Sequence, residues 1–483
     1  MSRSPNELRR LASQTALYGL STVVGRLLNY LLVPLHTRLF APEQYGVITD
    51  FYAMAALLAV VYTYGMETAF FRFVNRQNQD RRAVYATSFY AVLVSSVILS
   101  AVLWFNAESL AVVLRHPDKA HFVRWFALIF ALDAVSAIPF ARLRQEGRSV
   151  SYVTIKLLNI LVLVGLQVYF LVIQPAQNQA WVISLDSVVL SNLVANGLTF
   201  LVLLRGLPSW SAFDWRVLRP MLAYAWPLLI AGLAGMFNET LDRVLLKYRL
   251  GGTVSQALWQ VGVYGAVYKL AVLMSLFTQA FRMGAEPYFF GQKTAGNSDK
   301  PQPAYGKVFW YYSLIGWGIF LGVTLGIDAA KMLVGTAYHE GLPVVPILLL
   351  ANLCLGWYYN HSIWFKTQDQ TQWGLWIGLG AAVITVLGNW FLIPVYGYTA
   401  SAWVTLVCYA SMLLVSVLAS RRYQKVNYPW MGWGLLGAWA LVLYGLNSFL
   451  PTGLNATTLA LKFLLLVVYV LGVPLFRKFG LDR

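Results

Sequence analysis

Apolar stretches of roughly 20 residues, separated by short polar loops, follow one another from Leu11 almost to the end of the chain. An α-helix of this length crosses the roughly 30 Å of hydrocarbon in a bilayer. Backbone groups in lipid must be bonded within their own segment, which helices achieve, whereas barrel strands are about half as long and alternate polar with apolar residues. The pattern therefore predicts an all-α polytopic membrane protein with about 14 transmembrane helices. The predicted spans are residues 11–35, 47–70, 83–105, 122–140, 150–173, 181–204, 219–237, 261–281, 308–327, 343–365, 373–393, 398–419, 430–449 and 456–476.

The composition agrees with a chain that lies mostly in lipid. Hydrophobic residues make up 59% and charged residues 11%, and the mean hydropathy is +0.61. A soluble fold must also wet its exterior, so it has no use for this much apolar surface. The two cysteines, Cys354 and Cys408, both fall inside spans. No disulfide framework, metal site or cofactor is predicted from them.

The basic residues are distributed unequally between the two sides of the membrane. The net charge of +17 could indicate a nucleic-acid partner, but most of the Lys and Arg residues fall in the loops on the N-terminal side. Fewer fall on the other side, at Arg38, Arg115, Lys119, Arg243, Lys247, Arg249 and Lys331. By the positive-inside rule, both termini are predicted to be cytoplasmic. The charge thus indicates topology and anionic lipid headgroups as partners, and no nucleic acid.

The order of spans suggests two lobes of six helices around a central cavity, plus two extra C-terminal helices. We assign residues 1–205 to the N-terminal lobe, 206–218 to an interfacial connector, 219–420 to the C-terminal lobe and 421–483 to helices 13 and 14. A faint internal similarity supports the repeat, because residues 163–172 resemble 386–393 and residues 45–48 resemble 261–264. Parallel repeats of this kind place a substrate path between the lobes near the midplane.

Charges near the bilayer centre are the candidate site residues, since each costs on the order of 3 kcal/mol on insertion scales. Arg26 lies near the middle of the first span, on a polar helical face made of Tyr18, Thr22, Gly25, Arg26 and Asn29. Lys269 and Asp133 are central in their spans, and Lys156 lies in the inner third of the fifth. We predict that Arg26, Asn29, Lys156 and Lys269 bind substrate and that Asp133 is a coupling or charge partner.

Structural roles remain open for two of these residues. Asp133 could neutralise Arg26 or Lys156 in a buried pair that only joins helices, and Lys156 is close enough to the surface to snorkel. Taken together, the central charges are mainly positive, which would concentrate an anion in a low-dielectric cavity. Arginine binds phosphate oxygens through two parallel hydrogen bonds, so the simplest substrate is an anionic lipid carrying phosphate or pyrophosphate.

Several motifs resemble the bacterial polysaccharide (Wzx-type) flippase family, in the superfamily that also holds MATE exporters and the lipid II flippase. The similar segments are GRLLNYLLVPLHTRLFAPEQYGV at 25–47, ARLRQEGR at 141–148, NETLDR at 238–243, QAFRMGAEP at 279–287 and NWFLIPVYGYTASA at 389–402. The resemblance covers the first twelve spans. It implies a transporter of the bacterial inner membrane that moves polyprenyl-pyrophosphate-linked sugars to the outer leaflet by alternating access. It also implies that a basic residue in the first span, matched here by Arg26, lies in a cationic cavity.

Two other classes of membrane protein fit the sequence less well. A MATE-like cation-coupled multidrug exporter should have an acidic cavity, whereas most of the charged residues near the bilayer centre here are basic. A membrane polymerase or ligase of O-antigen would need a large outer loop with catalytic side chains, and the longest predicted outer loop, at about 238–260, has no histidine. The sequence thus predicts a transporter and not an enzyme. It leaves open the glycan, the coupling ion (proton or sodium) and the oligomeric state.

Overall fold

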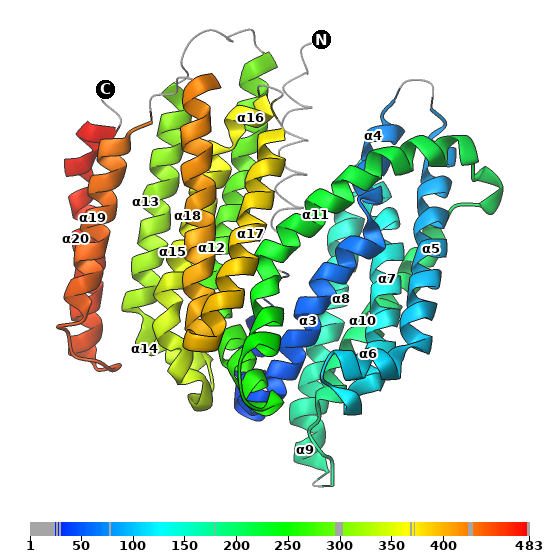
Figure 1. Cartoon of the computed structure of the whole chain (residues 1–483), viewed down its shortest axis with the longest axis horizontal. Helices are drawn as coiled ribbons and strands as arrows, with labels where there is room; N and C mark the ends of the chain where they lie inside the picture. The colour runs from blue at the N-terminus through cyan, green and yellow to red at the C-terminus, as the bar shows by residue number, and fades with distance from the viewer. Residues whose placement is uncertain are drawn as a thin grey trace. The chain divides into compact units, whose positions relative to one another are not determined.

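The computed structural model describes residues 25, 28, 30–76, 79–178, 180–294, 303–367, 370, 372–423 and 428–480. Every regular element within these ranges is helical, as the cartoon shows (Figure 1). The predicted all-α class is therefore confirmed. Most of the first predicted span, residues 11–35, lies outside the described residues.

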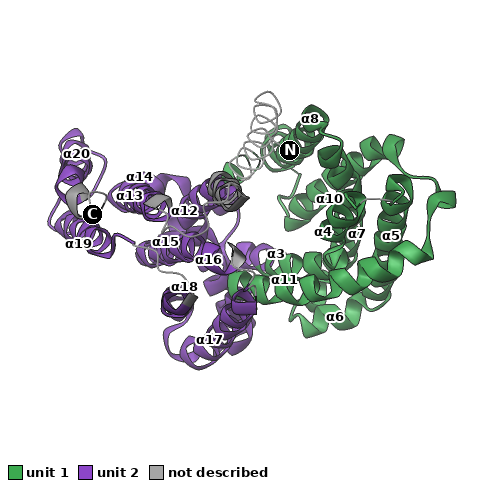
Figure 2. Ribbon diagram, turned by 90° about the horizontal axis from the view of Figure 1, so that it is seen from above, with its two compact units in different colours: residues 1–32, 50–240 green, residues 33–49, 241–483 purple. Residues whose placement is uncertain are grey.

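The chain divides by its internal contacts into two compact units, each described here by itself (Figure 2). Unit 1 holds residues 1–32 and 50–240, and unit 2 holds residues 33–49 and 241–483. The longer helices of unit 1 are α4 (Met66–Val74), α5 (Arg81–Phe105), α7 (Ala120–Gln145), α8 (Ser149–Val168) and α10 (Leu185–Leu203). Shorter helices of unit 1 are α6 (Ala107–Val113) and α9 (Gln174–Gln177).

Two long helices, α3 (Pro42–Thr63) and α11 (Trp215–Arg249), begin in one unit and end in the other. The helices of unit 2 are α2 (Leu32–Leu39), α12 (Val254–Thr294), α13 (Pro303–Leu325), α14 (Ile327–Ala330), α15 (Val345–His361), α16 (Ile363–Thr367), α17 (Gln372–Tyr396), α18 (Tyr398–Tyr423), α19 (Trp430–Asn447) and α20 (Ala456–Gly480). The lobe boundaries expected from the sequence, at residues 205 and 219, stay predictions.

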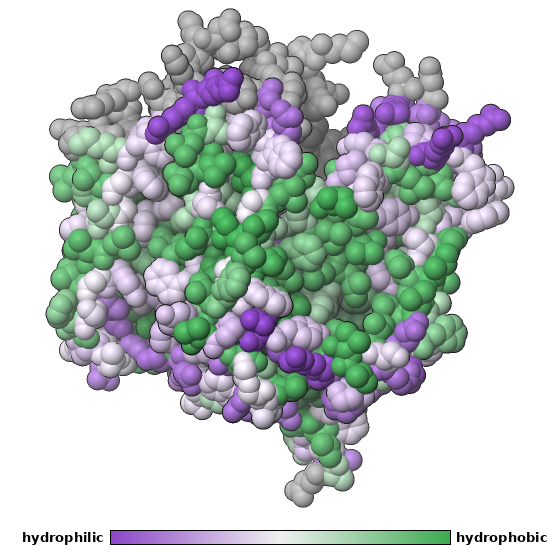
Figure 3. All heavy atoms as spheres, in the orientation of Figure 1, coloured by the Kyte–Doolittle hydropathy of each residue, from purple (hydrophilic) through white to green (hydrophobic). Residues whose placement is uncertain are grey.

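Twelve helical segments in the described residues are long and apolar enough to cross a membrane. They match predicted spans two to twelve and the fourteenth. The thirteenth is present as α19, an 18-residue helix that is not among these twelve. Apolar residues cover the middle of the visible face, and hydrophilic residues are more frequent toward the helix ends (Figure 3). This distribution fits helices surrounded by lipid.

Two predicted loops are wrong in their boundaries. The seventh span was expected to end at 237, but α11 continues to Arg249. Arg243 and Lys247 are therefore helical and buried, and they are not part of an outer loop. The loop expected at 282–307 begins as helix, because α12 runs to Thr294.

Unit 1 is organised around α7, which packs against α4, α5, α8 and α10. Its second span changes direction between α3 and α4, where Tyr64 and Gly65 have φ angles of 33° and 75°. Glycine adopts this left-handed conformation without steric cost. A Cβ atom at Gly65 would also lie 2.8 Å from the Cβ of Leu228. The bend directs Glu67, in the first turn of α4, toward α7.

In unit 2, the start of α3 crosses α12 at two glycines. A Cβ atom at Gly46 would lie 2.0 Å from the carbonyl oxygen of Leu258, and one at Gly262 would lie 1.9 Å from that of Pro42. Each glycine therefore faces the carbonyl four residues before the other glycine. A two-fold axis that relates the similar segments around Gly46 and Gly262 would produce reciprocal contacts of this kind.

The α19–α20 hairpin packs on α13 and is joined to the rest of unit 2 by Asp328 of α14. The Asp328 carboxylate accepts hydrogen bonds from Lys331 Nζ at 2.8 Å, Lys462 Nζ at 2.6 Å and the Gly453 backbone N–H at 3.0 Å. Burial opposes ionisation of Asp328, but the bonds from the two lysines and from Gly453 outweigh it and lower the pKa of this carboxyl below its ordinary value. The hairpin thus depends on an ionised Asp328.

We predict that Asp328→Asn loosens this hairpin. Removing the charge leaves the buried Lys462 ammonium without its counter-ion, which should cost about 2 kcal/mol or more of unfolding free energy. Because the folded-state pKa is lowered, the contribution is present above a pH of about 4 and is lost as the pH falls further. Thermal unfolding and hydrogen exchange of residues 448–462 would measure both effects.

The matched control is Asp118→Asn, because the Asp118 side chain is 71% exposed and its ion pair with Lys119 is superficial. This change should cost less than about 1 kcal/mol. Equal stability losses in the two variants would contradict the role of Asp328.

Candidate functional site

A cavity of about 310 Å³ lies inside unit 1, among α4, α7, α8 and α10. Asp133 is at the middle of α7, and Lys156 is two turns into α8. Both side chains were expected to lie within the membrane, and the structure brings them to one cavity. The lining residues are Glu67, Asp133, Ser136, Ala137, Phe140, Arg144, Tyr152, Lys156, Asn159, Asn196 and Thr199.

The cavity contains two acidic and two basic side chains. Arg144 donates a hydrogen bond to Glu67 across α7 and α4. Asp133 and Lys156 interact electrostatically but form no direct ion pair within the described residues. The Lys156 ammonium lies 4.4 Å from the centre of the Phe140 ring, and Asp133 is accessible from the cavity. A separated pair of opposite charges leaves both free to contact a ligand, an ion or water.

An amide and hydroxyl network forms another wall of the cavity. The Asn159 side-chain amide donates to Asn196 Oδ1 at 3.0 Å and to Thr199 Oγ1 at 2.9 Å. Asn196 donates to Asn192 Oδ1 at 3.2 Å, and Asn192 donates to the Tyr52 hydroxyl at 2.8 Å. The network joins α8, α10 and α3, so it fixes the rotation of each helix while keeping polar atoms inside the unit.

Two polar atoms of the cavity lining have no hydrogen-bond partner among the described residues. They are the Ser136 hydroxyl and the Nε of Arg144, and both are buried. An unsatisfied buried polar group costs about 1–3 kcal/mol. Atoms of this kind at a cavity wall favour occupation by water or by a polar ligand.

The chemistry of the cavity suits a polyhydroxylated ligand. Asn and Thr side chains both donate and accept hydrogen bonds, carboxylates accept, and ammonium and guanidinium groups donate. Tyr152 and Phe140 add aromatic surface beside these groups. The volume is at the lower end of the range for small-ligand pockets. Its size therefore fits one small polar group and not a whole lipid-linked molecule.

The other predicted site residues are not part of this cavity. Arg26 and Asn29 lie outside the described residues. The neighbouring Gly25 is described, and a Cβ atom there would lie 2.7 Å from Ile160 Cδ1, so the chain passes close to α8 at this point. Lys269 lies in unit 2, half-buried on α12, with its ammonium 5.3 Å from the centre of the Tyr45 ring.

Comparison with known proteins decides the family. A model of the family described as "Polysaccharide biosynthesis protein" matches residues 11–291, which is more than half of the chain. The chain belongs to this family. The resemblance to bacterial polysaccharide flippases is thereby confirmed at the level of the family.

Individual relatives are more distant. The succinoglycan biosynthesis transport protein ExoT of Rhizobium meliloti (strain 1021) is 25% identical over 116 residues, which is 24% of this chain and 23% of that protein. Among solved structures, the lipid II flippase MurJ in an inward closed conformation has a TM-score of 0.74 at 11% identity, covering 97% of this chain and 100% of that one. An inward-facing multidrug resistance MATE family transporter of the MOP superfamily has a TM-score of 0.65 at 14% identity, with coverages of 83% and 94%. These likenesses establish the fold.

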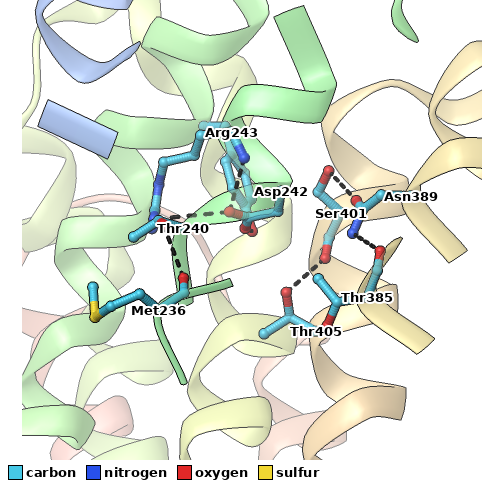
Figure 4. Close-up of polar contacts among 9 residues, drawn as sticks. Met236, Thr240, Asp242, Arg243, Thr385, Asn389, Ser401 and Thr405 are labelled. Carbon is cyan, nitrogen blue, oxygen red and sulfur yellow. Dashed lines mark hydrogen bonds and ion pairs between the residues drawn. The ribbon is translucent and has the colours of Figure 1, made fainter. Parts of the chain in front are cut away.

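Two motifs that resemble the flippase family become polar clusters of unit 2 (Figure 4). On α11, Asp242 accepts a hydrogen bond from the Tyr264 hydroxyl at 2.8 Å, and the Arg243 guanidinium lies 4.1 Å from the centre of the Tyr268 ring. Lys247, one turn further, is fully buried. These residues were not predicted as part of a site, because the seventh span was expected to end at residue 237, before them. A polar face continuing past 237 at helical spacing was the available signal.

The second cluster joins α17 and α18. Asn389 is fully buried, donates to the Thr385 carbonyl at 2.8 Å and accepts from the Ser401 hydroxyl at 2.8 Å. Thr405 donates to the Ser401 carbonyl at 2.8 Å. These bonds satisfy the buried polar side chains within the helix pair. They explain why polar residues occur in two otherwise apolar spans of a member of this family.

We predict that the cavity of unit 1 is reached by water. In Asp133→Cys, a small charged methanethiosulfonate reagent should label the new thiol, because Asp133 is accessible in the cavity. Val135→Cys is the control, since Val135 is 4% exposed on another face of α7. The natural cysteines, Cys354 and Cys408, are both buried and should give little background. Labelling of Val135→Cys with Asp133→Cys unlabelled would contradict the assignment.

Proposed function

We propose that this chain is a flippase for an anionic lipid-linked oligosaccharide, a polyprenyl-pyrophosphate carrying sugars. It moves this substrate from the inner to the outer leaflet of the bacterial inner membrane by alternating access, for cell-surface polysaccharide synthesis. The single observation that supports this most is a polar cavity lined by Asp133, at the middle of its span, and by Lys156, in a member of the polysaccharide biosynthesis family.

The cavity of unit 1 is assigned to the sugar part of the substrate. Sugar hydroxyls donate and accept hydrogen bonds, as do Asn159, Asn196 and Thr199. The Ser136 hydroxyl, which has no hydrogen-bond partner in the described part of the chain, adds one further group. Hydrated hydroxyls cannot cross hydrocarbon without a substitute for their water, because each unbonded polar group costs several kcal/mol there. A hydrophilic wall inside the membrane supplies that substitute.

The pyrophosphate is assigned to Arg26 and Lys269, two positive charges predicted near the midplane. Lys269 lies one turn beyond Gly265 on the α12 face that crosses α3, where the tight packing of small residues ends. Lys156 contributes a third positive charge, which Asp133 offsets when no substrate is bound. Asp133 is thus the partner through which a proton or sodium ion could couple to substrate binding.

Alternating access requires a contact that closes one end of the path and can open again. The crossing of α3 and α12 has the composition of such a contact. Gly46 and Gly262 let the two backbones touch with no side chain between them, so the helices can part at this point without withdrawing an interlocked side chain. The predicted topology places this crossing near the outer surface, opposite the basic side.

A multidrug exporter is the second candidate, because the fold is also similar to a MATE family transporter. The two functions differ in what the cavity must hold. An exporter of cationic drugs needs a net negative site, whereas the cavity of unit 1 has as many basic as acidic side chains. Assays with both substrate classes distinguish them.

We predict that the purified protein in liposomes moves a fluorescent polyprenyl-pyrophosphate oligosaccharide between leaflets and that Asp133→Asn slows this movement. Loss of the charge facing Lys156 should lower the rate by about tenfold, which equals about 1.4 kcal/mol in the barrier. Insertion and thermal stability should stay near wild type, because Asp133 forms no direct ion pair within the described residues. A wild-type rate in the variant would remove Asp133 from the mechanism. Transport of a cationic dye with no movement of the glycolipid would overturn the flippase assignment.

We predict that Gly262→Ala impairs transport. Its methyl group would lie 1.9 Å from the Pro42 carbonyl oxygen, so α3 and α12 could no longer close against each other. Gly380→Ala is the matched control within unit 2, because a Cβ atom there meets nothing within 4 Å. Both changes raise helix propensity by about 1 kcal/mol. A loss of transport in Gly262→Ala alone is therefore due to the steric clash where α3 crosses α12. Equal rates in both variants would argue against a closing contact there.

A further inference from the structure

A second cavity of unit 1, of about 740 Å³, lies on a different face of α7, α8 and α10 from the first. It is bounded by the last turn of α7, the first turns of α8 and the end of α10, so it lies at the basic end of these helices. Its lining residues are Tyr85, Pro139, Arg142, Leu143, Glu146, Arg148, Val150, Ser151, Thr154, Ile155, Val202, Leu203, Arg205, Gly206 and Leu207.

An apolar layer separates the two cavities. Phe140, Leu143 and Leu203 form a buried cluster against which Tyr152 and Ile155 pack. The glycan site proposed above lies on one side of this layer, and the second cavity lies on the other. The second cavity is therefore a separate site, and its ligand need not be the transported substrate.

The charge of the second cavity is positive. Arg142 is held by Glu146, with Nε to Oε1 at 2.5 Å, and Arg148 lies 3.8 Å from the other oxygen of Glu146. Arg205 is exposed and has no ion-pair partner among the described residues. Three arginines against one glutamate leave an excess of positive charge at the cavity mouth. The hydroxyls of Ser151 and Thr154 add neutral hydrogen-bonding groups.

Arg142 is positioned by contacts that leave part of its guanidinium accessible. Arg142 donates to the Gly206 carbonyl at 2.9 Å and lies 4.7 Å from the centre of the Tyr85 ring. The Tyr85 hydroxyl donates to the same carbonyl at 2.8 Å. The side chains of Arg142 and Arg148 remain 37% and 59% exposed. A preorganised guanidinium with free N–H groups matches phosphate geometry.

An apolar track continues from this cavity along the membrane-spanning part of the unit. Leu158 and Leu161 follow Thr154 on one face of α8, and Val194 and Leu198 precede Val202 on one face of α10. All four side chains are exposed, and α8 packs against α10. A positively charged pocket that opens onto such an apolar surface is complementary to a phospholipid. The phosphate would bind at the helix ends, and the acyl chains would lie along the helices.

We propose that the second cavity binds an anionic phospholipid of the cytoplasmic leaflet, with its phosphate among Arg142, Arg148 and Arg205 and an acyl chain between α8 and α10. Basic pockets between transmembrane helices on the cytoplasmic side are suited to anionic headgroups. The bound lipid would join the end of α10 to α7 and α8, and so hold the connector that starts at Gly206. The orientation rests on the predicted topology, and the site does not depend on the proposed transport function.

The test measures lipid binding by the full chain in nanodiscs of phosphatidylcholine doped with spin-labelled phosphatidylglycerol. Wild type should retain phosphatidylglycerol in preference to phosphatidylcholine. The double variant Arg148→Gln/Arg205→Gln should weaken this preference by about tenfold. The control double variant is Arg216→Gln/Arg219→Gln, which removes two exposed arginines of the same membrane side from outside the cavity. It should bind as wild type does.

Three outcomes would overturn the proposal. Equal retention of the two lipids by wild type would exclude a site for anionic phospholipid. Equal losses in both double variants would mean that only general surface charge attracts the lipid. Displacement of the labelled lipid by millimolar inorganic phosphate would show that the arginines bind free phosphate and that the apolar track contributes nothing.

Discussion

A charged side chain inside a bilayer must meet either an opposite charge or water, and this requirement organises unit 1. Four charges lie in its cavity, and each depends on neighbours from another helix: Glu67 of α4 with Arg144 of α7, and Asp133 of α7 facing Lys156 of α8. The helices can satisfy these charges only if their polar faces turn inward together. The packing of α4, α7 and α8 and the position of the cavity therefore have the same cause.

The spans could be predicted from the sequence because length and hydropathy alone decide whether a segment can cross the bilayer. The end of α11 could not be located by hydropathy, because Asp242, Arg243 and Lys247 lower the local value as a loop would. Burial of this segment depends on partners distant in sequence, such as the Tyr264 hydroxyl bonded to Asp242. Where a helix ends among charges is decided by tertiary contacts, which a single sequence does not reveal.

The candidate site was predictable in part for the same reason. The cost of isolated charge in lipid singled out Asp133 and Lys156, which the structure brings to one cavity. The neutral residues Asn159 and Asn196 give no comparable signal, since amides also occur at helix ends. Their importance becomes visible only when α8 and α10 are set side by side and the 3.0 Å bond between them is seen. The sharing of a cavity by Arg26 and Lys269 stays a prediction.

Helices α7, α8 and α10 line the polar cavity with one face and the arginine pocket with another, so binding in one can affect binding in the other. One face holds the polar cavity, another holds the arginine pocket, and the layer of Phe140, Leu143 and Leu203 between them is close-packed. Packed layers transmit displacement, because their compressibility is low. A lipid that holds the ends of these helices together would favour one spacing between them, and a substrate group entering the cavity would favour its own. If the two spacings agree, each ligand strengthens the binding of the other, and this coupling must be equal in both directions.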